Sequence, residues 1–307
     1  MSAEILDGKS VAEQIRDELA AEVAAIAEQH GRVPGLSVVL VGDDPASETY
    51  VRNKGRAAEK AGIRSETIRL PKTTSTEELL GLIDTLNGRD DVDGILVQLP
   101  LPEPIDKDKI LLAVAPEKDV DGFHPTNVGN LVAGRPSPVP CTPAGIMELL
   151  RRAEVPLEGA EAVILGRSDI VGKPMALLLL RADATVTVCH SRTRDLAMVT
   201  RRADVLVAAI GRPGFVTAEH VRPGAVVIDV GINRVDDRAQ AEALTGGNPK
   251  RMEAFDNRGS ILVGDCHPAQ VPEVAGRYTP VPGGVGPLTI ALLLRNTVDA
   301  FRRLRLS

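Results

Sequence analysis

Apolar runs that alternate with helical segments constrain the fold of this chain more than any other feature of its sequence. Residues Leu36 to Val41 form a near-continuous apolar run, which is typical of a parallel strand buried on both faces of a sheet. Weaker strand-like runs follow at 63–70 and 94–99, and segments with helical spacing lie between them. Since alternating strands and helices build mostly parallel sheets, we expect the first half of the chain to be α/β.

The second half of the chain repeats this alternation after a proline-rich stretch at 136–140. Five further strands are predicted, at 162–165, 184–189, 205–210, 225–230 and 261–263. A chain of 307 residues is natural for two domains, so the proline-rich stretch is the predicted junction between them. The charged segment 236–258 contains a Gly-Gly-Asn-Pro sequence, and this composition predicts an exposed loop.

Charge and composition exclude several classes of partner. The formal net charge of -6 provides no long-range attraction to nucleic acid or to an anionic membrane surface. The three cysteines, Cys141, Cys189 and Cys266, have no metal-ligand spacing and suit a reducing compartment. The N-terminus lacks a signal-peptide pattern, and the apolar runs are too short to span a membrane. We therefore expect a cytoplasmic protein with no metal site and no nucleic-acid or membrane partner.

Tyr50 and Lys54 are the first candidate functional residues, and they lie in a predicted helix that ends before Gly62. Residues four apart share one face of a helix. A phenol that can stack on a flat ring therefore lies beside an amine that can move protons. The alternative is a solvent-exposed helix with a surface tyrosine and lysine, because most lysines are exposed.

Gln98 and Asp121 could converge on this pair. Gln98 lies just past the carboxyl end of a predicted strand, where open α/β sheets bind their ligands. Its alternative is a glutamine that simply satisfies nearby backbone groups. Asp121 lies in a loop between Val120 and Gly122, where a turn-forming aspartate is the alternative interpretation.

The stretch from Gly166 to Gly172 follows a predicted strand and precedes a helix, which is the layout of a dinucleotide-binding turn. It departs from the usual three-glycine pattern, because Ser168 holds the second glycine position and Val171 the third. A tight turn at this place still directs helix N-terminal amides at a phosphate. An ordinary turn between a strand and a helix is the alternative.

The end of the next strand indicates which nucleotide would bind. NAD sites usually place an acidic residue about 20 positions further on, where it bonds the ribose hydroxyl. Here the strand ends at Cys189 and is followed by His190, Ser191 and Arg192, with no acid. A hydroxyl and cations, with Arg167 able to join them, suit the 2′-phosphate of NADP. A solvent-exposed basic loop is the alternative.

Two later segments are further candidates for ligand contact. The loop that contains Pro282, Gly283 and Gly284 leads directly into the last predicted helix, and glycines allow close approach of the backbone to a ligand. A plain helix-start loop is the alternative. The apolar strand near Val226 runs into a loop ending at Asn233 that could line a nicotinamide.

Together these stretches resemble the bifunctional methylenetetrahydrofolate dehydrogenase/methenyltetrahydrofolate cyclohydrolase family. The similar segments span nearly the whole chain in the order of the family: Tyr50–Lys54, Gly94–Pro102, Asp119–Pro125, Pro140–Pro143, Gly166–Pro174, Val227–Asn233 and Thr279–Pro287. The departures are Leu288, where the family often has Met, and Cys266, where Val is usual. Neither departure falls on an expected catalytic position.

The resemblance implies two α/β domains flanking a cleft, usually in a homodimer. Residues 1–139 and 280–307 would form a folate-binding catalytic domain, and residues 140–279 an NADP-binding Rossmann-like domain. The last helix would return to the N-terminal domain. The implied reactions are NADP-dependent oxidation of 5,10-methylenetetrahydrofolate to the 5,10-methenyl form, and hydrolysis of that product to 10-formyltetrahydrofolate.

The resemblance also implies roles for individual residues. Lys54 would transfer protons with Gln98 as its partner, Tyr50 would contact the folate, and Asp121 would anchor the pterin. Pro282 and Gly283 are expected to contact the substrate. The expected cofactor contacts are Gly166, Arg167, Ser168, Ser191 and Ile232.

Two other functions remain open from the sequence. A dehydrogenase of similar build that uses NADP on another small substrate would explain 166–172 but not Tyr50, Lys54, Gln98 and Asp121. A non-catalytic nucleotide sensor would bind the cofactor without turnover, and the presence of the lysine argues against it.

Overall fold

The computed structural model describes residues 2–306, except for the side chain of Ala46. The chain divides into two compact units. The three-stranded unit contains Ala12–Cys141 and the residues from Ile290 onward, and the six-stranded unit contains the residues up to Val11 and Thr142–Thr289. Each unit is described separately below.

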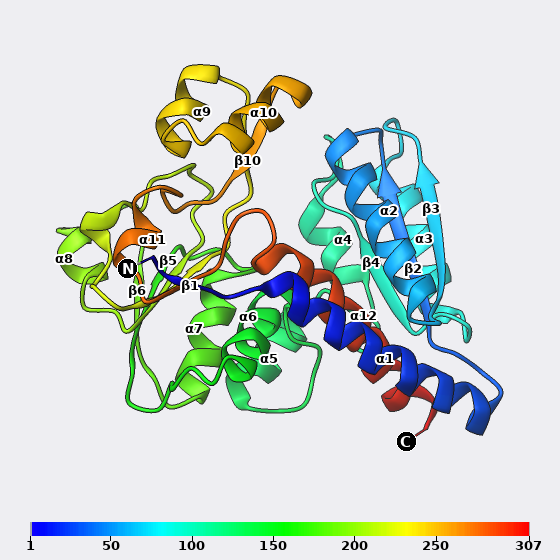
Figure 1. Cartoon of the computed structure of the whole chain (residues 1–307). Coiled ribbons are helices and arrows are strands. Elements are labelled where there is room, and N and C mark those ends of the chain that lie inside the picture. Colours follow the sequence, from blue (N-terminus) through cyan, green and yellow to red (C-terminus); the bar gives the residue numbers. More distant parts are fainter. Residues whose placement is uncertain (1, 307) are drawn as a thin grey trace. The chain divides into compact units, whose positions relative to one another are not determined.

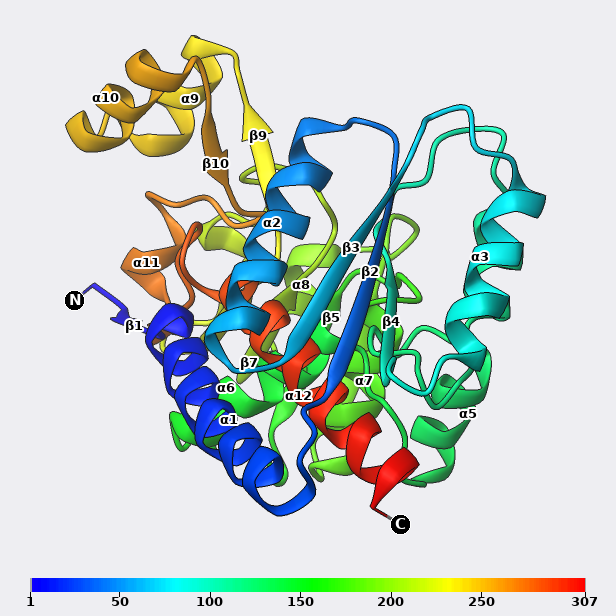
Figure 2. The same ribbon diagram turned by 90° about the vertical axis from the view of Figure 1, so that its right-hand side faces the viewer.

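The three-stranded unit has a parallel sheet in the order β3-β2-β4, formed by β3 (Arg64–Leu70), β2 (Gly35–Val41) and β4 (Gly94–Val97). Every residue of β2 is buried, which confirms the strand predicted from its apolar run. Helix α3 (Thr76–Gly88) packs on one face, and α2 (Pro45–Lys60) lies on the other (Figure 2). Helix α4 (Lys107–Ala113) contributes to the same apolar core as α3. The helix α5 (Pro125–Ala133) follows.

The last helix, α12 (Val285–Arg305), lies along part of the first helix, α1 (Gly8–His30). Within the three-stranded unit Arg295 and Arg302 each form an ion pair with Glu22, both at 2.7 Å. The expected return of the last helix to the N-terminal part of the chain is therefore confirmed. None of the helices between residues 2 and 306 is long and apolar enough to cross a membrane.

The six-stranded unit has a parallel sheet of the Rossmann type. Its order is β1-β11-β8-β7-β5-β6, formed by β1 (Glu4–Ile5), β11 (Arg277–Tyr278), β8 (Val226–Asp229), β7 (Val205–Ala208), β5 (Glu161–Leu165) and β6 (Thr185–Cys189). Strand β5 lies between β6 and β7, so the chain reverses its direction across the sheet at that point. Dinucleotides bind at such a switch point, outside the carboxyl ends of the strands.

The helices of this unit are α6 (Cys141–Arg152), α7 (Gly172–Arg181), α8 (Leu196–Thr200) and α11 (Val271–Val274), with a short 3-10 turn at Ala218–His220. The core of the sheet consists of aliphatic residues from its strands, including Val163, Leu206 and Val227.

The charged segment 236–258 is not the exposed loop that its composition predicts. It forms α9 (Arg238–Thr245) and α10 (Pro249–Arg258), which lie above the two-stranded hairpin of β9 (Asn233–Val235) and β10 (Ile261–Val263) (Figure 1). A small apolar core between these helices and the hairpin contains Leu244, Met252 and Phe255. The prediction was wrong because few apolar residues, widely spaced among charges, are enough to pack two short helices.

The strand at 261–263 is also placed differently from the prediction. It pairs antiparallel with β9 in the hairpin and not with the Rossmann-type sheet. The sheet is completed instead by β11 and β1, which contain two residues each. Strands this short have no detectable alternation of apolar and polar residues, so their pairing is visible only in the folded chain.

The compact units differ slightly from the expected domains of residues 1–139 with 280–307 and residues 140–279. The residues up to Val11 and those at 280–289 group with the six-stranded unit. The physical reason is that β1 pairs with β11, and the amide of Lys9 donates to the carbonyl of Gly283 at 2.9 Å.

Candidate active site

Lys54 and Gln98 form a hydrogen-bonded pair in the three-stranded unit. Helix α2 carries Lys54, whose side chain is buried with only 8% of its surface exposed. Its Nζ donates to Gln98 Oε1 at 3.0 Å. Gln98 follows β4, and its Nε2 donates to the Leu99 carbonyl at 2.6 Å. This second bond fixes the amide so that its oxygen faces the amine. The expected pairing of Lys54 with Gln98 is therefore present in the structure.

Tyr50 lies one helical turn before Lys54, as the spacing predicts. Its side chain is 40% exposed, so the ring is accessible to a ligand. Desolvation raises the pKa of the Tyr50 phenol, which keeps the hydroxyl protonated and able to donate a hydrogen bond.

The loop that carries Asp121 is shaped by another carboxylate, that of Asp119. Asp119 is buried and accepts hydrogen bonds from the amides of Gly122 and His124, at 3.1 and 2.7 Å, and from Asn127 Nδ2 at 2.9 Å. The role of turn former therefore belongs to Asp119, and the Asp121 carboxylate is left for another purpose. Sequence reasoning overlooked Asp119, although its position two residues before the candidate was a usable signal.

Asp121 has an unusual electrostatic environment. Burial raises the pKa of its carboxyl group to about 6. The positive charge of Lys54 opposes this shift in the pKa, and the negative charge of Asp119 adds to it. The carboxyl is thus coupled to the lysine that the sequence analysis placed in the same site, and it is poised to change its charge near neutral pH.

Asn296 of α12 ties the residue before Asp121 to a second segment of main chain, at Val139. Its Nδ2 donates to the carbonyls of Val120 and Val139, both at 2.9 Å. Cys141 Sγ also donates to the Val120 carbonyl at 3.2 Å, and burial raises the pKa of this thiol well above its usual value, so it stays protonated. The sequence signal for Asn296 was a polar residue inside an apolar helix.

The turn after β5 has the close backbone approaches of a nucleotide-binding turn. A Cβ atom on Gly166, whose φ is 129°, would lie 2.1 Å from the carbonyl oxygen of Ala209. A Cβ atom on Gly172 would lie 2.4 Å from the carbonyl oxygen of Gly166. Only glycine fits these two positions. Ser168 Oγ accepts from the amides of Val171 and Gly172, at 3.2 and 3.3 Å, and so organises the start of α7.

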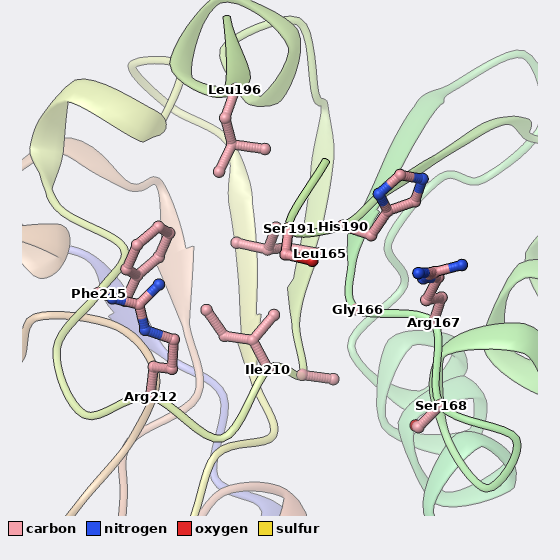
Figure 3. A pocket seen from close by; sticks show the side chains of 11 residues that line it. Leu165, Gly166, Arg167, Ser168, His190, Ser191, Leu196, Ile210, Arg212 and Phe215 are labelled. Atoms are coloured by element: carbon pink, nitrogen blue, oxygen red, sulfur yellow. The ribbon is translucent and has the colours of Figure 1, made fainter. Parts of the chain in front are cut away.

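A pocket of about 310 Å³ opens at the carboxyl ends of β5, β6 and β7 (Figure 3). Arg167 and His190 lie on one side of it, and Arg212 and Phe215 lie on the other. The Arg212 guanidinium is 4.3 Å from the centroid of the Phe215 ring. The complete lining is Leu165, Gly166, Arg167, Ser168, His190, Ser191, Leu196, Ala209, Ile210, Arg212 and Phe215.

Most of the expected cofactor contacts line this pocket, and others do not. Gly166, Arg167, Ser168 and Ser191 belong to the lining. Ile232, an expected cofactor contact, is absent from the lining that the described residues form. So is Arg192, which the sequence suggested as a cation for the 2′-phosphate. The Arg192 amide donates to His190 Nδ1 at 3.1 Å, and Ile232 is 47% exposed on a separate loop. His190 and Arg212 are lining residues that the sequence analysis did not select.

Pro282 and Gly283 lie in the loop before α12, within the six-stranded unit. Gly283 has a φ of 107°, and its carbonyl accepts the Lys9 amide. The Arg251 guanidinium donates to the carbonyl of Val281 at 2.9 Å. These bonds fix the loop in place.

The structure brings Tyr50, Lys54, Gln98 and Asp121 together in one unit, and most of the cofactor candidates together in the other.

The fold and the two sets of residues define a class of two-unit α/β enzyme with a Rossmann-type nucleotide site. Residues 6–121 match the family described as tetrahydrofolate dehydrogenase/cyclohydrolase, catalytic domain, and residues 140–305 match the NAD(P)-binding domain of the same family. The chain belongs to the tetrahydrofolate dehydrogenase/cyclohydrolase family, and it is a bifunctional enzyme with both activities.

Similar proteins from other organisms agree with this assignment. The chain is 63% identical to the bifunctional protein FolD of Koribacter versatilis, over 98% of this chain and 97% of that protein. A crystal structure of the bifunctional enzyme FolD from Campylobacter jejuni shares 44% identity with a TM-score of 0.89, over 99% of this chain and 100% of that one. The Trypanosoma brucei enzyme, solved with NADP cofactor and an inhibitor, shares 42% identity with a TM-score of 0.89, over 99% of both chains. These matches do not support a dehydrogenase for another substrate or a nucleotide sensor.

Proposed function

We propose that this enzyme oxidises 5,10-methylenetetrahydrofolate with NADP and then hydrolyses the 5,10-methenyl product to 10-formyltetrahydrofolate. The observation that carries the proposal is the buried Lys54–Gln98 pair, with its 3.0 Å hydrogen bond, electrostatically coupled to Asp121. The dehydrogenase step requires the nucleotide, whereas hydrolysis requires proton transfer at the folate. The two reactions therefore make different demands on the residues described above.

The pocket residues fit NADP. Ser191 provides a hydroxyl just after β6, where an NAD site would place an acid, and Arg167 in the turn after β5 provides a cation to the same pocket. Phosphate groups prefer such charge-assisted contacts. Bound NADP would accept the hydride from the folate, and these side chains would hold its 2′-phosphate. The NADP complex of the Trypanosoma brucei enzyme supports this choice of nucleotide.

The residues around Lys54 would bind and orient the folate. The Asp121 carboxylate can accept paired hydrogen bonds from the amide-like edge of the pterin, which is a strong arrangement when it is desolvated. The accessible Tyr50 ring would lie against the flat substrate. In the loop before α12, Pro282 and Gly283 would supply further substrate contacts.

Hydrolysis would depend on the amine of Lys54. Water must lose a proton as it adds to the methenyl carbon, and a proton must reach the ring nitrogen when the carbon–nitrogen bond breaks. A neutral amine can accept the proton that water loses, and the resulting ammonium can donate a proton to the ring nitrogen. Burial or a nearby positive charge favours the neutral form that this requires. Gln98 would hold the Lys54 amine through an uncharged oxygen, which orients it without the strong stabilisation of the ammonium that a carboxylate would give.

The roles of the domains and the assembly belong to the same proposal. Residues 1–139 with 280–307 would bind the folate, and residues 140–279 would bind NADP, in line with the family matches at 6–121 and 140–305.

We also propose a homodimer. Among the described strands, none pairs with the outer edge of β6. Val188 of β6 and Leu180 of α7, which packs on β6, are both exposed. Three buried free cysteines suit a cytoplasmic location.

The proposal is tested by supplying 5,10-methylenetetrahydrofolate with either NADP or NAD, and following both the 5,10-methenyl and 10-formyl products. We expect both products, and a higher kcat/KM with NADP, because Arg167 and Ser191 line the pocket in which the 2′-phosphate would bind. Equal or better use of NAD would contradict the assigned nucleotide. Formation of neither product would contradict the assigned substrate.

A further inference from the structure

A buried carboxylate outside the pocket, that of Asp265, organises one wall of the nucleotide site. Asp265 follows β10 and is fully buried. Its Oδ2 accepts hydrogen bonds from the amides of Ile210 and Gly211, at 2.6 and 3.0 Å. Its Oδ1 accepts from the amide of Arg212 at 2.8 Å and from Asn233 Nδ2 at 2.9 Å. Four donors therefore converge on one side chain.

The main chain beside Asp265 holds the other end of the same loop. The carbonyl of Gly264 accepts the Gly214 amide at 3.0 Å, and the carbonyl of Asp265 accepts the Val216 amide at 2.9 Å. The loop at 210–216 is thus tied to Asp265 and its neighbour along most of its length. This loop supplies Ile210, Arg212 and Phe215 to the pocket wall (Figure 3).

Asp265 is itself fixed in place by its neighbours. Its amide donates to Asp229 Oδ1 at 2.8 Å, and the same oxygen accepts the Gly231 amide at 3.0 Å. A Cβ atom on Gly231 would lie 2.4 Å from Asp265 Oδ1. Because Asn233 begins β9, directly after the loop that follows β8, Asp265 links the loops that follow the neighbouring strands β7 and β8.

We propose that Asp265 is a positioning residue for the nucleotide site. Its carboxylate accepts hydrogen bonds from three successive amides that would otherwise be free to rearrange. These bonds hold Arg212 and Phe215 in the orientation that receives the nucleotide. Asp265 does not line the pocket that these residues form, so it acts through the loop. This inference rests on the proposed binding of NADP in the pocket.

The bifunctional enzyme provides an internal control, because hydrolysis of supplied 5,10-methenyltetrahydrofolate uses no nucleotide. The variant D265N keeps the shape of the side chain but presents an NH₂ group to donors that need an acceptor. We expect its Kd for NADP, measured by titration calorimetry, to rise on the order of 10- to 100-fold, as is typical when the support of a ligand-contacting group is lost. The KM for NADP should rise with it, while the folate KM and cyclohydrolase turnover stay unchanged.

Two further variants sharpen the test. N233A removes one of the four donors and leaves the three amides bound, so it should raise the Kd for NADP less than D265N does. D204N serves as a matched control, because the Asp204 carboxylate also accepts backbone and arginine donors, from Glu161 and Arg222, at the opposite end of β7. D204N should leave NADP affinity at the wild-type value.

An unchanged Kd for NADP in D265N would overturn the assignment. An equal fall of cyclohydrolase turnover would also overturn it, since Asp265 would then support the fold in general. If D265N does not fold, N233A decides: a higher Kd for NADP with unchanged cyclohydrolase activity supports the role of Asp265, and an unchanged Kd contradicts it. Failure of the wild-type enzyme to bind NADP would overturn the proposed function, and this assignment with it.

Discussion

At the scale of single residues, the charges of the folate site depend on a few side chains with fixed neighbours. Lys54 is buried beside an uncharged partner, Gln98, and its positive charge lowers the pKa of the Asp121 carboxyl group against the effect of burial. Helical spacing predicted that Tyr50 and Lys54 share a face, because the period of a helix is regular. Loops have no such period. The sequence therefore offered two aspartates in one loop, and the structure was needed to show that Asp119 forms the turn and Asp121 does not.

At the scale of the residue, the pKa of Asp121 predicts a pH dependence of folate binding. Burial raises this pKa to about 6, and the pterin recognition proposed for Asp121 uses the ionised carboxylate. The KM for 5,10-methylenetetrahydrofolate should therefore rise as the pH falls through about 6, and Asp121→Asn should raise the KM at neutral pH and remove the pH dependence. Steady-state kinetics over this range check both outcomes.

The pH dependence of folding stability has the opposite sign to that of folate binding, and measuring it provides an independent control. A carboxyl group with a raised pKa in the folded state stabilises the fold fully below its usual pKa, and that contribution is lost as the pH rises through the folded value. Ligand-free enzyme should lose this contribution as the pH rises through about 6, in the same range in which folate binding improves. A folate KM that does not vary with pH would contradict the role of Asp121.

At the scale of the element, helix α12 supports the loop of the site through one polar side chain. Asn296 donates to the carbonyl of Val120, next to Asp121, and to that of Val139, and it lies in a stretch whose other residues are mostly apolar. The sequence predicted the helix from its apolar residues. It did not reveal the contacts of Asn296, because they join residues more than 150 positions apart.

Asn296→Ala should loosen the loop that carries Asp121. The loss of two buried hydrogen bonds costs about 1–3 kcal/mol, and the folate KM should rise on the order of tenfold for both reactions while the KM for NADP stays constant. Thr297→Val is a suitable control, because the Thr297 hydroxyl donates to the Leu293 carbonyl of its own helix and not to the loop of Asp121. Normal folate KM values in Asn296→Ala would show that the loop holds its shape without this side chain.

At the scale of the whole molecule, the two α/β series and the nucleotide turn followed from the sequence, because buried parallel strands have a strong local pattern. The edge of the six-stranded sheet did not, because β1 and β11 are short and pair across most of the chain length. The small core of α9 and α10 was missed for a similar reason. Its residues Leu244, Met252 and Phe255 are few, and their packing partners lie on the hairpin.

The two activities of the whole enzyme should separate at Lys54, and this separation is the central claim of the account. The variant Lys54→Met keeps an unbranched side chain that is one atom shorter, and it removes the amine. Loss of a general acid–base group typically lowers the rate by about 10²- to 10⁴-fold, so cyclohydrolase turnover should nearly disappear. The dehydrogenase step needs no proton from the protein, because the nitrogen lone pair expels the hydride, and it should fall much less.

The deciding measurement is the ratio of dehydrogenase to cyclohydrolase turnover in Lys54→Met, with NADP affinity as the control for folding. The account predicts a large rise in this ratio and accumulation of 5,10-methenyltetrahydrofolate in the reaction mixture. A parallel fall of both activities in a folded variant would show that Lys54 only anchors the substrate. Unchanged cyclohydrolase turnover would show that Lys54 takes no part in the reaction.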